Sequence, residues 1–87
     1  MDNKKNYEIR LSTRKNKKYM ARYINSKKWV HFGDQRYDQY RDSTPLMAYR
    51  GSNHLDDNRK LLYKRRHENN RHHVGSAGWL SDVFLWS

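Results

Sequence analysis

Apolar and polar residues alternate in three short stretches near the N-terminus, and this two-residue period is typical of half-buried β-strands. The first stretch is residues 7–11, within a basic segment that we assign to residues 1–18. The second and third stretches, 19–24 and 29–32, are separated by a polar run typical of a turn, so we predict a β-hairpin over residues 19–34. Three strands with one apolar face are about the minimum for a stable sheet, and we expect an antiparallel meander.

Alternation also predicts which side chains of the hairpin share a face. Tyr19, Ala21 and Tyr23 fall on one face of the second strand, and Trp29 and His31 fall together on one face of the third. In a sheet this small, such rings are expected to form the core. The alternative is that rings interleaved with Lys and Arg stack on the bases of a single-stranded nucleic acid.

The middle of the chain, residues 35–54, is a connection rich in Tyr, Asp, Arg and Ser. Within it, Thr44 as a cap and Pro45 at the first helical position predict one or two helical turns. Gly51 then supplies a stop signal for this short helix.

A longer helix is predicted over residues 55–68. Two aspartates stand at its start and the basic run 64–67 stands at its end, which is the polarity that the helix dipole favours. Tyr63 and His67 are four residues apart and therefore share a face. We expect this basic amphipathic helix to lie across the sheet.

The most apolar segment is residues 77–86, which contains Trp79 and Trp86. Strand alternation fails in its last residues, so we favour a helix or an irregular tail that packs on the sheet. The predicted fold class is therefore α+β. It is a single small domain over residues 1–87, with a three-stranded antiparallel sheet, one basic amphipathic helix and a Trp-rich C-terminal segment.

Composition suggests that a partner completes this small core. Hydrophobic residues are 34% of the 87 residues, below the roughly 45–50% of ordinary globular domains. Aromatic residues are 14% of the chain, which argues against disorder because disordered chains are poor in them. A chain of this length buries only about 60% of the surface that it exposes when unfolded. We therefore expect a folded domain that gains from contact with neighbours.

The net charge of +10 indicates an acidic partner, which could be phosphate groups, acidic protein surfaces or anionic lipid. The charge is uneven, with a net +8 over residues 1–52 and a net +2 over residues 53–87. The contact therefore belongs to the N-terminal half. No apolar run approaches the length of about 18 residues typical of a membrane span, and we expect none.

Basic runs in the N-terminal half are the candidate contact sites. Such runs are often only solvated loops, and the alternative is contact with a polyanion or an acidic partner. We assign the contact to six residues in predicted loops or turns that are free to reach outward: Arg14, Lys15, Lys17, Lys18, Lys27 and Lys28.

An ordered set of short motifs covers residues 17–86. The set consists of His31-Phe32-Gly33, then Arg59-Lys60-x-x-Tyr63-x-x-Arg66-His67, then Ala77-Gly78-Trp79 and Leu85-Trp86. With these motifs the chain resembles a family of small, basic, uncharacterised proteins of large double-stranded DNA viruses, with related versions in tailed phages. The resemblance implies a virion component rather than a catalyst. We assign a structural role to His31, Gly33, Arg59, Tyr63, Arg66, His67, Trp79 and Trp86.

Candidate chemistry is sparse. There is no Cys, and the five His lack the well-spaced partners of a tetrahedral metal site. No nucleophile motif and no Gly-rich phosphate loop is present, so we expect no enzyme, no cofactor, no metal and no small-molecule substrate. We interpret Arg66 and His67 instead as groups that reach back to Gly33-Asp34. We also expect Asp56 or Asp57 to pair with Arg59 or Lys60.

The leading hypothesis is a minor capsid or cement protein that bridges capsid subunits on the inner side of the shell. Its expected partners are the major capsid protein and other minor capsid proteins. Its expected location is the capsid interior, with passage through the host cytoplasm or nucleus during assembly. The alternative is a nucleic-acid-binding protein associated with the viral genome, in which case the partner is DNA or RNA.

Overall fold

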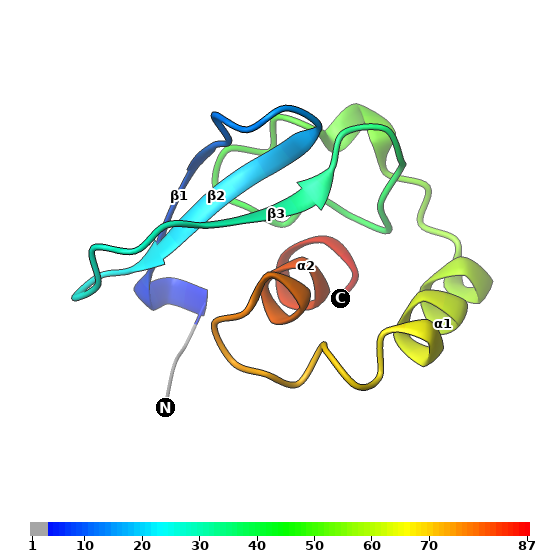
Figure 1. The fold of residues 1–87 in the computed structure, drawn as a ribbon. Helices are drawn as coiled ribbons and strands as arrows, with labels where there is room; N and C mark the ends of the chain where they lie inside the picture. The colour runs from blue at the N-terminus through cyan, green and yellow to red at the C-terminus, as the bar shows by residue number, and fades with distance from the viewer. Residues whose placement is uncertain (1–3) are drawn as a thin grey trace.

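The sheet is a three-stranded antiparallel meander, as predicted (Figure 1). A computed structural model describes residues 4–87, so the first three residues of the basic segment 1–18 lie outside the described chain. A 3₁₀ turn at Lys4–Asn6 leads into strand β1 (Tyr7–Leu11). Strands β2 (Lys17–Tyr23) and β3 (Val30–Asp34) follow in the order β1-β2-β3.

One face of this sheet carries the core. Tyr19 lies opposite Leu11 on β1 and Phe32 on β3, and Ala21 lies opposite Val30. Tyr19, Ala21 and Phe32 have no exposed surface, so the predicted inward face of β2 is confirmed. The turns at both ends of β2 keep the strands in sequence order, which is why local alternation was enough to predict them.

Helix α2 (Ala77–Leu85) covers that face. It begins at Ser76, whose hydroxyl accepts a hydrogen bond from the backbone N–H of Trp79 at 3.2 Å. Leu80, Phe84 and Leu85 are buried against the core face of the sheet. The helix predicted for the apolar C-terminal segment is confirmed, and the fold is α+β.

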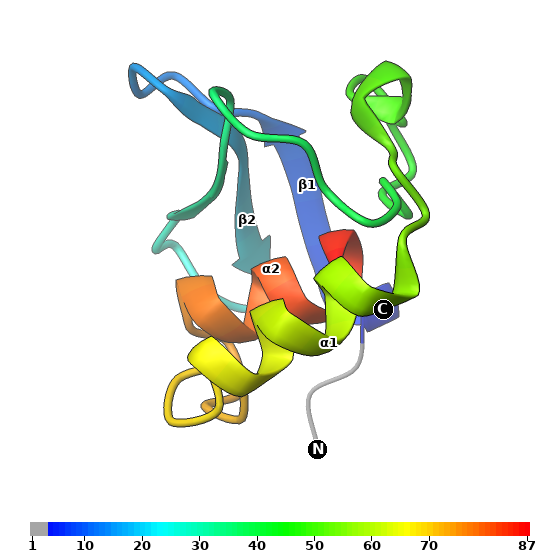
Figure 2. The same ribbon diagram turned by 90° about the vertical axis from the view of Figure 1, so that its right-hand side faces the viewer.

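Helix α1 (Asp57–Arg66) lies alongside α2, on the same side of the sheet (Figure 2). Asp56 caps it, because its carboxylate accepts from the backbone N–H of Asn58 at 2.9 Å and of Arg59 at 3.2 Å. The helix begins two residues later than predicted, since Leu55 has a φ of +56°, which a right-handed helix excludes. No residue of α1 is fully buried. The expectation that the basic helix lies across the sheet is therefore wrong, because α2 covers the sheet and α1 lies beside α2.

The predicted ion pairs within α1 are wrong. Asp56 binds backbone N–H groups, and Asp57 accepts from the Tyr40 hydroxyl at 2.8 Å. The ion pair that anchors the helix is instead between helices, from Lys64 to the buried Asp82 of α2 at 2.7 Å. A carboxylate at a helix start is already occupied by the free backbone N–H groups there.

The short helix predicted after Thr44 is also wrong. Buried Asp42 accepts hydrogen bonds from the backbone N–H and the hydroxyl of Thr44, at 3.0 and 2.7 Å, and holds the chain in a turn. Met47 has a φ of +47°, which interrupts any right-handed helix. The 3₁₀ turn of this connection lies later, at Arg50–Ser52, and includes Gly51.

Candidate binding groove

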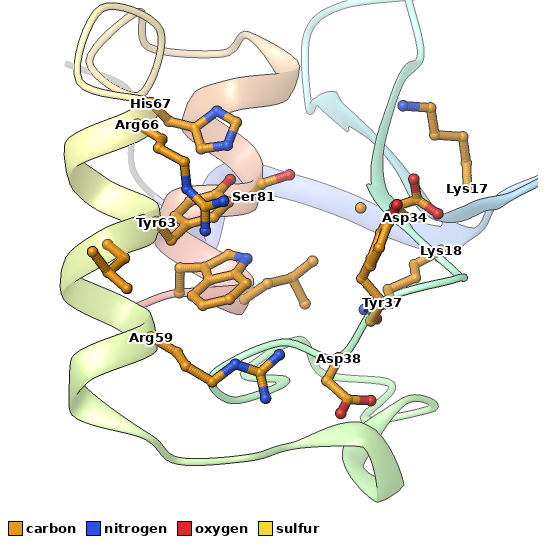
Figure 3. A pocket seen from close by; sticks show the side chains of 14 residues that line it. Lys17, Lys18, Asp34, Tyr37, Asp38, Arg59, Tyr63, Arg66, His67 and Ser81 are labelled. Atoms are coloured by element: carbon orange, nitrogen blue, oxygen red, sulfur yellow. Dashed lines mark hydrogen bonds between the residues drawn. The ribbon is translucent and has the colours of Figure 1, made fainter.

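A cavity of about 540 Å³ opens between α1 and the end of β3 (Figure 3). One side is formed by α1, and the opposite side by the start of β2 at Lys17, the end of β3 at Asp34 and the segment that follows β3. Leu85 and Trp86, at the end of α2, complete the lining. We call this cavity the groove.

The groove side of α1 is one helical face. Arg59, Tyr63 and Arg66 follow each other at spacings of four and three residues, which places them on the same side of a helix. Figure 3 shows Arg59, Tyr63, Arg66 and His67 extending from α1 toward the opposite side of the cavity. Four residues of the helical sequence motif, Arg59, Tyr63, Arg66 and His67, thus line the groove.

A ladder of aromatic rings attaches α1 to the rest of the fold. The rings of Tyr63 and Trp86 are stacked at a centroid distance of 4.1 Å with an angle of 2° between planes. His67 lies 4.3 Å from Tyr63, His54 lies 5.3 Å from Trp86, and Tyr40 lies 6.1 Å from His54. Burial raises the pKa of Tyr63 to about 12, so its phenol stays neutral. The ladder joins four separate segments of the chain.

Gly33 allows the opposite side of the groove to approach α2 closely. Its φ is +80°, a region that favours glycine. A Cβ atom there would lie 3.0 Å from Leu85 Cδ1 and 3.1 Å from Lys18 Cβ. The glycine of the His31-Phe32-Gly33 motif is therefore required for backbone shape and for packing.

Lys18 was predicted as an exposed contact residue, and this is wrong. It lies in β2 with only 2% of its surface exposed. Its ammonium group donates to the carbonyl oxygen of Tyr37 at 2.8 Å and to the side-chain oxygen of Gln39. Burial lowers the pKa of Lys18, and nearby carboxylates, of which Asp38 is the strongest, act against this shift. The segment after β3 folds over Lys18, which local sequence does not reveal.

Some charged side chains of the groove have an ion-pair partner and others have none. Asp34 pairs with Arg36 at 2.8 Å, and this pairing lowers the pKa of Asp34 to about 2. The suggested bonds from Arg66 and His67 back to Asp34 are therefore not formed, although all three residues line the same cavity. Across residues 4–87, the exposed guanidinium groups of Arg59 and Arg66 have no hydrogen bond or ion pair with another side chain. The α1 side of the groove therefore presents free positive charge.

The structure brings together most of the residues assigned to the structural motif. Six of the eight line the groove: Gly33, Arg59, Tyr63, Arg66, His67 and Trp86. Trp79 lies elsewhere, with its ring 5.5 Å from that of Tyr7. His31 also lies elsewhere, and its Nδ1 atom is 2.7 Å from the Ser12 hydroxyl.

The contact residues predicted from the basic runs do not form one patch. Arg14 and Lys15 are exposed in the turn between β1 and β2. Lys27 and Lys28 are exposed in the loop between β2 and β3, at the opposite end of the sheet. Lys17 is half-buried in β2 and lines the groove. Strand β2 separates the two exposed pairs.

Sequence reasoning missed a second basic cluster, on the sheet face that points away from the helices. The guanidinium groups of Arg10 and Arg22 lie 5.2 and 4.8 Å from the ring centre of Trp29. Glu8 pairs with Arg10 at 2.7 Å and with Arg22 at 2.9 Å. We call Glu8, Arg10, Arg22 and Trp29 the outer cluster. Trp29 was expected among the core rings, and this is wrong, because strand register brings its ring against Arg10 and Arg22 instead.

Two histidines give the fold a pH dependence. The Nδ1 atom of His54 accepts from the backbone N–H of Asp56 at 3.0 Å, and its buried Nε2 atom has no partner within residues 4–87. Burial lowers the pKa of His54 from 6.5, with a further contribution from Arg59. Burial, followed by the charges of Arg14 and Lys17, also lowers the pKa of His31. Both rings are therefore favoured in the neutral form in the folded chain.

We expect the free energy of unfolding to fall as the pH drops below about 6.5, because the unfolded chain then takes up protons that folded His54 and His31 resist. Thermal melting between about pH 8 and about pH 5, followed by circular dichroism, measures this loss because that range includes the ordinary histidine pKa. His54→Asn keeps an acceptor near Nδ1 and should flatten the dependence, and His73→Asn at an exposed site is the matched control. Equal slopes for His54→Asn and the native chain would contradict the assignment.

Two further observations on the described residues concern metal binding and membrane spanning. Within residues 4–87, no three His, Asp or Glu side chains gather in a way that could hold a metal ion. No helix in the same range is long and apolar enough to cross a membrane.

One family model matches part of the chain. Residues 7–45 match DUF5754, a family of unknown function. This stretch contains the whole sheet and the first part of the connection, and it ends before α1. No curated protein and no solved structure matches the chain. The match therefore includes the strand side of the groove but not its α1 side.

Proposed function

We propose that this protein is a non-catalytic structural component of a large double-stranded DNA virus particle, where it binds an acidic surface of a neighbouring capsid protein in the groove. The observation that carries the proposal is the α1 face with Arg59 and Arg66, whose charges are unpaired within residues 4–87. The resemblance of the sequence motifs to small basic proteins of large double-stranded DNA viruses supports the assignment of the protein to a virus particle. The acidic nature of the partner follows from the unpaired charge.

The composition of the groove supports a protein partner. Trp, Tyr and Arg are the residue types that are enriched at the energetic centres of protein interfaces. The groove combines the two arginines with the stacked pair Tyr63 and Trp86. Leu62 on the same helix is 51% exposed, which adds apolar surface that a partner would cover. An acidic segment with an apolar side chain fits this lining.

Adjacent residues of α1 provide a matched test. Arg66 lines the groove, whereas Arg65 is exposed and does not. Arg66→Glu should weaken binding to the capsid partner at least about tenfold, which is ~1.4 kcal/mol, while Arg65→Glu should change it little. Binding is measured by surface plasmon resonance with the purified capsid proteins of the virus. Equal losses for the two variants would show that only net charge matters and would contradict a specific groove.

The location in a particle is tested separately. Purified virions are stripped stepwise with salt and detergent, and each fraction is analysed by mass spectrometry. The proposal expects the protein to leave together with capsid subunits. Its absence from the particle would refute the virion assignment.

A further inference from the structure

Within residues 4–87, no helix or strand covers the sheet face that points away from the helices. Both helices lie on one side of the sheet (Figures 1 and 2). The side-chain contacts of the outer cluster are made within the cluster itself. Arg10 is 58% exposed at its side chain and Arg22 is 33% exposed. This face is therefore open to a large partner.

The outer cluster continues toward the turn between β1 and β2. There, the Ser12 hydroxyl bonds to His31 at 2.7 Å and accepts the backbone N–H of Arg14 at 3.0 Å, which places Arg14 beside this face. Arg10, Arg14 and Arg22 thus form a basic band along this face.

The charge of this band is more one-sided than that of the groove. The band contains Arg10, Arg14 and Arg22, and Glu8 is the single carboxylate among the residues named here. In contrast, the groove includes two carboxylates of its own, Asp34 and Asp38. A polyanion with regularly repeated charge complements the band better than it complements the groove.

Trp29 adds an aromatic surface in the middle of the band. Its ring is now in contact with Arg10 and Arg22. A contact between an exposed cation and a ring is weaker than the stacking of a base on an aromatic side chain. A base can therefore displace an arginine from the ring, and that arginine is then free to bind the phosphate next to the base.

We propose that this outer sheet face is a binding site for single-stranded nucleic acid, in which Arg10, Arg14 and Arg22 contact phosphates and Trp29 stacks on a base. A single strand is favoured over a duplex because its bases are free to lie on an open sheet. Recognition through phosphates and one ring implies little sequence preference. The site is separate from the groove, so a protein that uses both would bridge a capsid surface and a nucleic acid.

Binding of the full chain to a fluorescein-labelled oligothymidylate, followed by fluorescence anisotropy over a series of salt concentrations, tests the proposal. Arg10→Gln/Arg14→Gln removes two exposed charges from the band. We expect this variant to bind at least about tenfold more weakly and to reduce the salt slope by about 1.4, at roughly 0.7 per phosphate contact. Trp29→Leu should weaken binding and abolish the quenching of tryptophan fluorescence by the oligonucleotide.

The matched control is Arg59→Gln/Arg66→Gln, which removes two charges from the groove instead. The proposal expects this control to retain oligonucleotide binding, while it loses the capsid partner. Equal losses of oligonucleotide binding in the two double variants would overturn the proposal. It would also be overturned if a duplex bound as tightly as the single strand and Trp29→Leu did not weaken binding. Because Arg10 and Arg14 are exposed, their variant remains informative even if Trp29→Leu fails to fold. If the nucleic-acid proposal fails, the proposed function of the groove is unaffected, because each site is tested with its own variants and its own ligand.

Discussion

Asp42→Ala is expected to lower the free energy of unfolding by about 3 kcal/mol or more, because it leaves several buried donors without an acceptor. The Asp42 carboxylate is 3% exposed and accepts from the Tyr19 hydroxyl, from Thr44 and from the backbone N–H of Tyr49 at 3.0 Å. Burial, together with the bond to Asp42, raises the pKa of Tyr19 to about 12, so this phenol remains a donor. For a domain of this size, such a loss is a large part of the total stability.

Chemical denaturation followed by circular dichroism measures this loss. Tyr19→Phe is the matched control, since it removes one donor and leaves the carboxylate with its other partners. We expect it to cost only about 1 kcal/mol. Similar midpoints for Asp42→Ala and the native chain would show that the buried network does not hold the connection against the sheet.

Trp86→Ala is expected to cost about 2–3 kcal/mol and to release α1, because the stacked pair with Tyr63 is the main aromatic contact of that helix. The estimate is below that for a fully buried ring, since Trp86 is half-buried. Lys64 and Asp82 would still connect the two helices. The groove would then lose its ordered α1 side, and binding of the capsid partner would fall.

Native-state hydrogen exchange distinguishes local release from global unfolding. In Trp86→Ala, the amides of α1 should exchange faster, while those of β2 keep most of their protection. Trp29→Ala is the matched control, because it removes the same side chain from the outer cluster and should leave α1 unchanged. Unchanged exchange of α1 in Trp86→Ala would contradict the role of the ladder.

The sheet was predictable because the residues that specify its strands and turns are close together in the sequence. Residues 7–11 alternate on their own, and the turns on either side of β2 are short, so strand order follows from chain order. The ends of α1 were predicted to within about two residues from the aspartates before it and the basic run at its end, which act within one helical turn. The apolar C-terminal helix was predictable because such a segment needs burial.

The connection 35–54 was not predictable, because its shape depends on distant groups. Thr44 resembles a helix cap in sequence, but the buried Asp42 determines its conformation, and Asp42 is in turn bound by Tyr19 from the sheet. Lys18 resembles a solvated residue of a basic run. Its burial requires the oxygens of Tyr37 and Gln39, which approach only when the segment after β3 folds back.

The sequence alone determined the α+β class, the three strands and both helices, because propensity, alternation and helix-end charges act over a few residues. Tertiary structure alone decided that Gly33, Arg59, Tyr63, Arg66, His67 and Trp86 meet in one cavity. It also decided that Lys18 is buried and that Arg10 and Arg22 lie on Trp29. The physical reason is that these contacts join residues far apart in the chain, and only the packing of α2 against the sheet sets their distances.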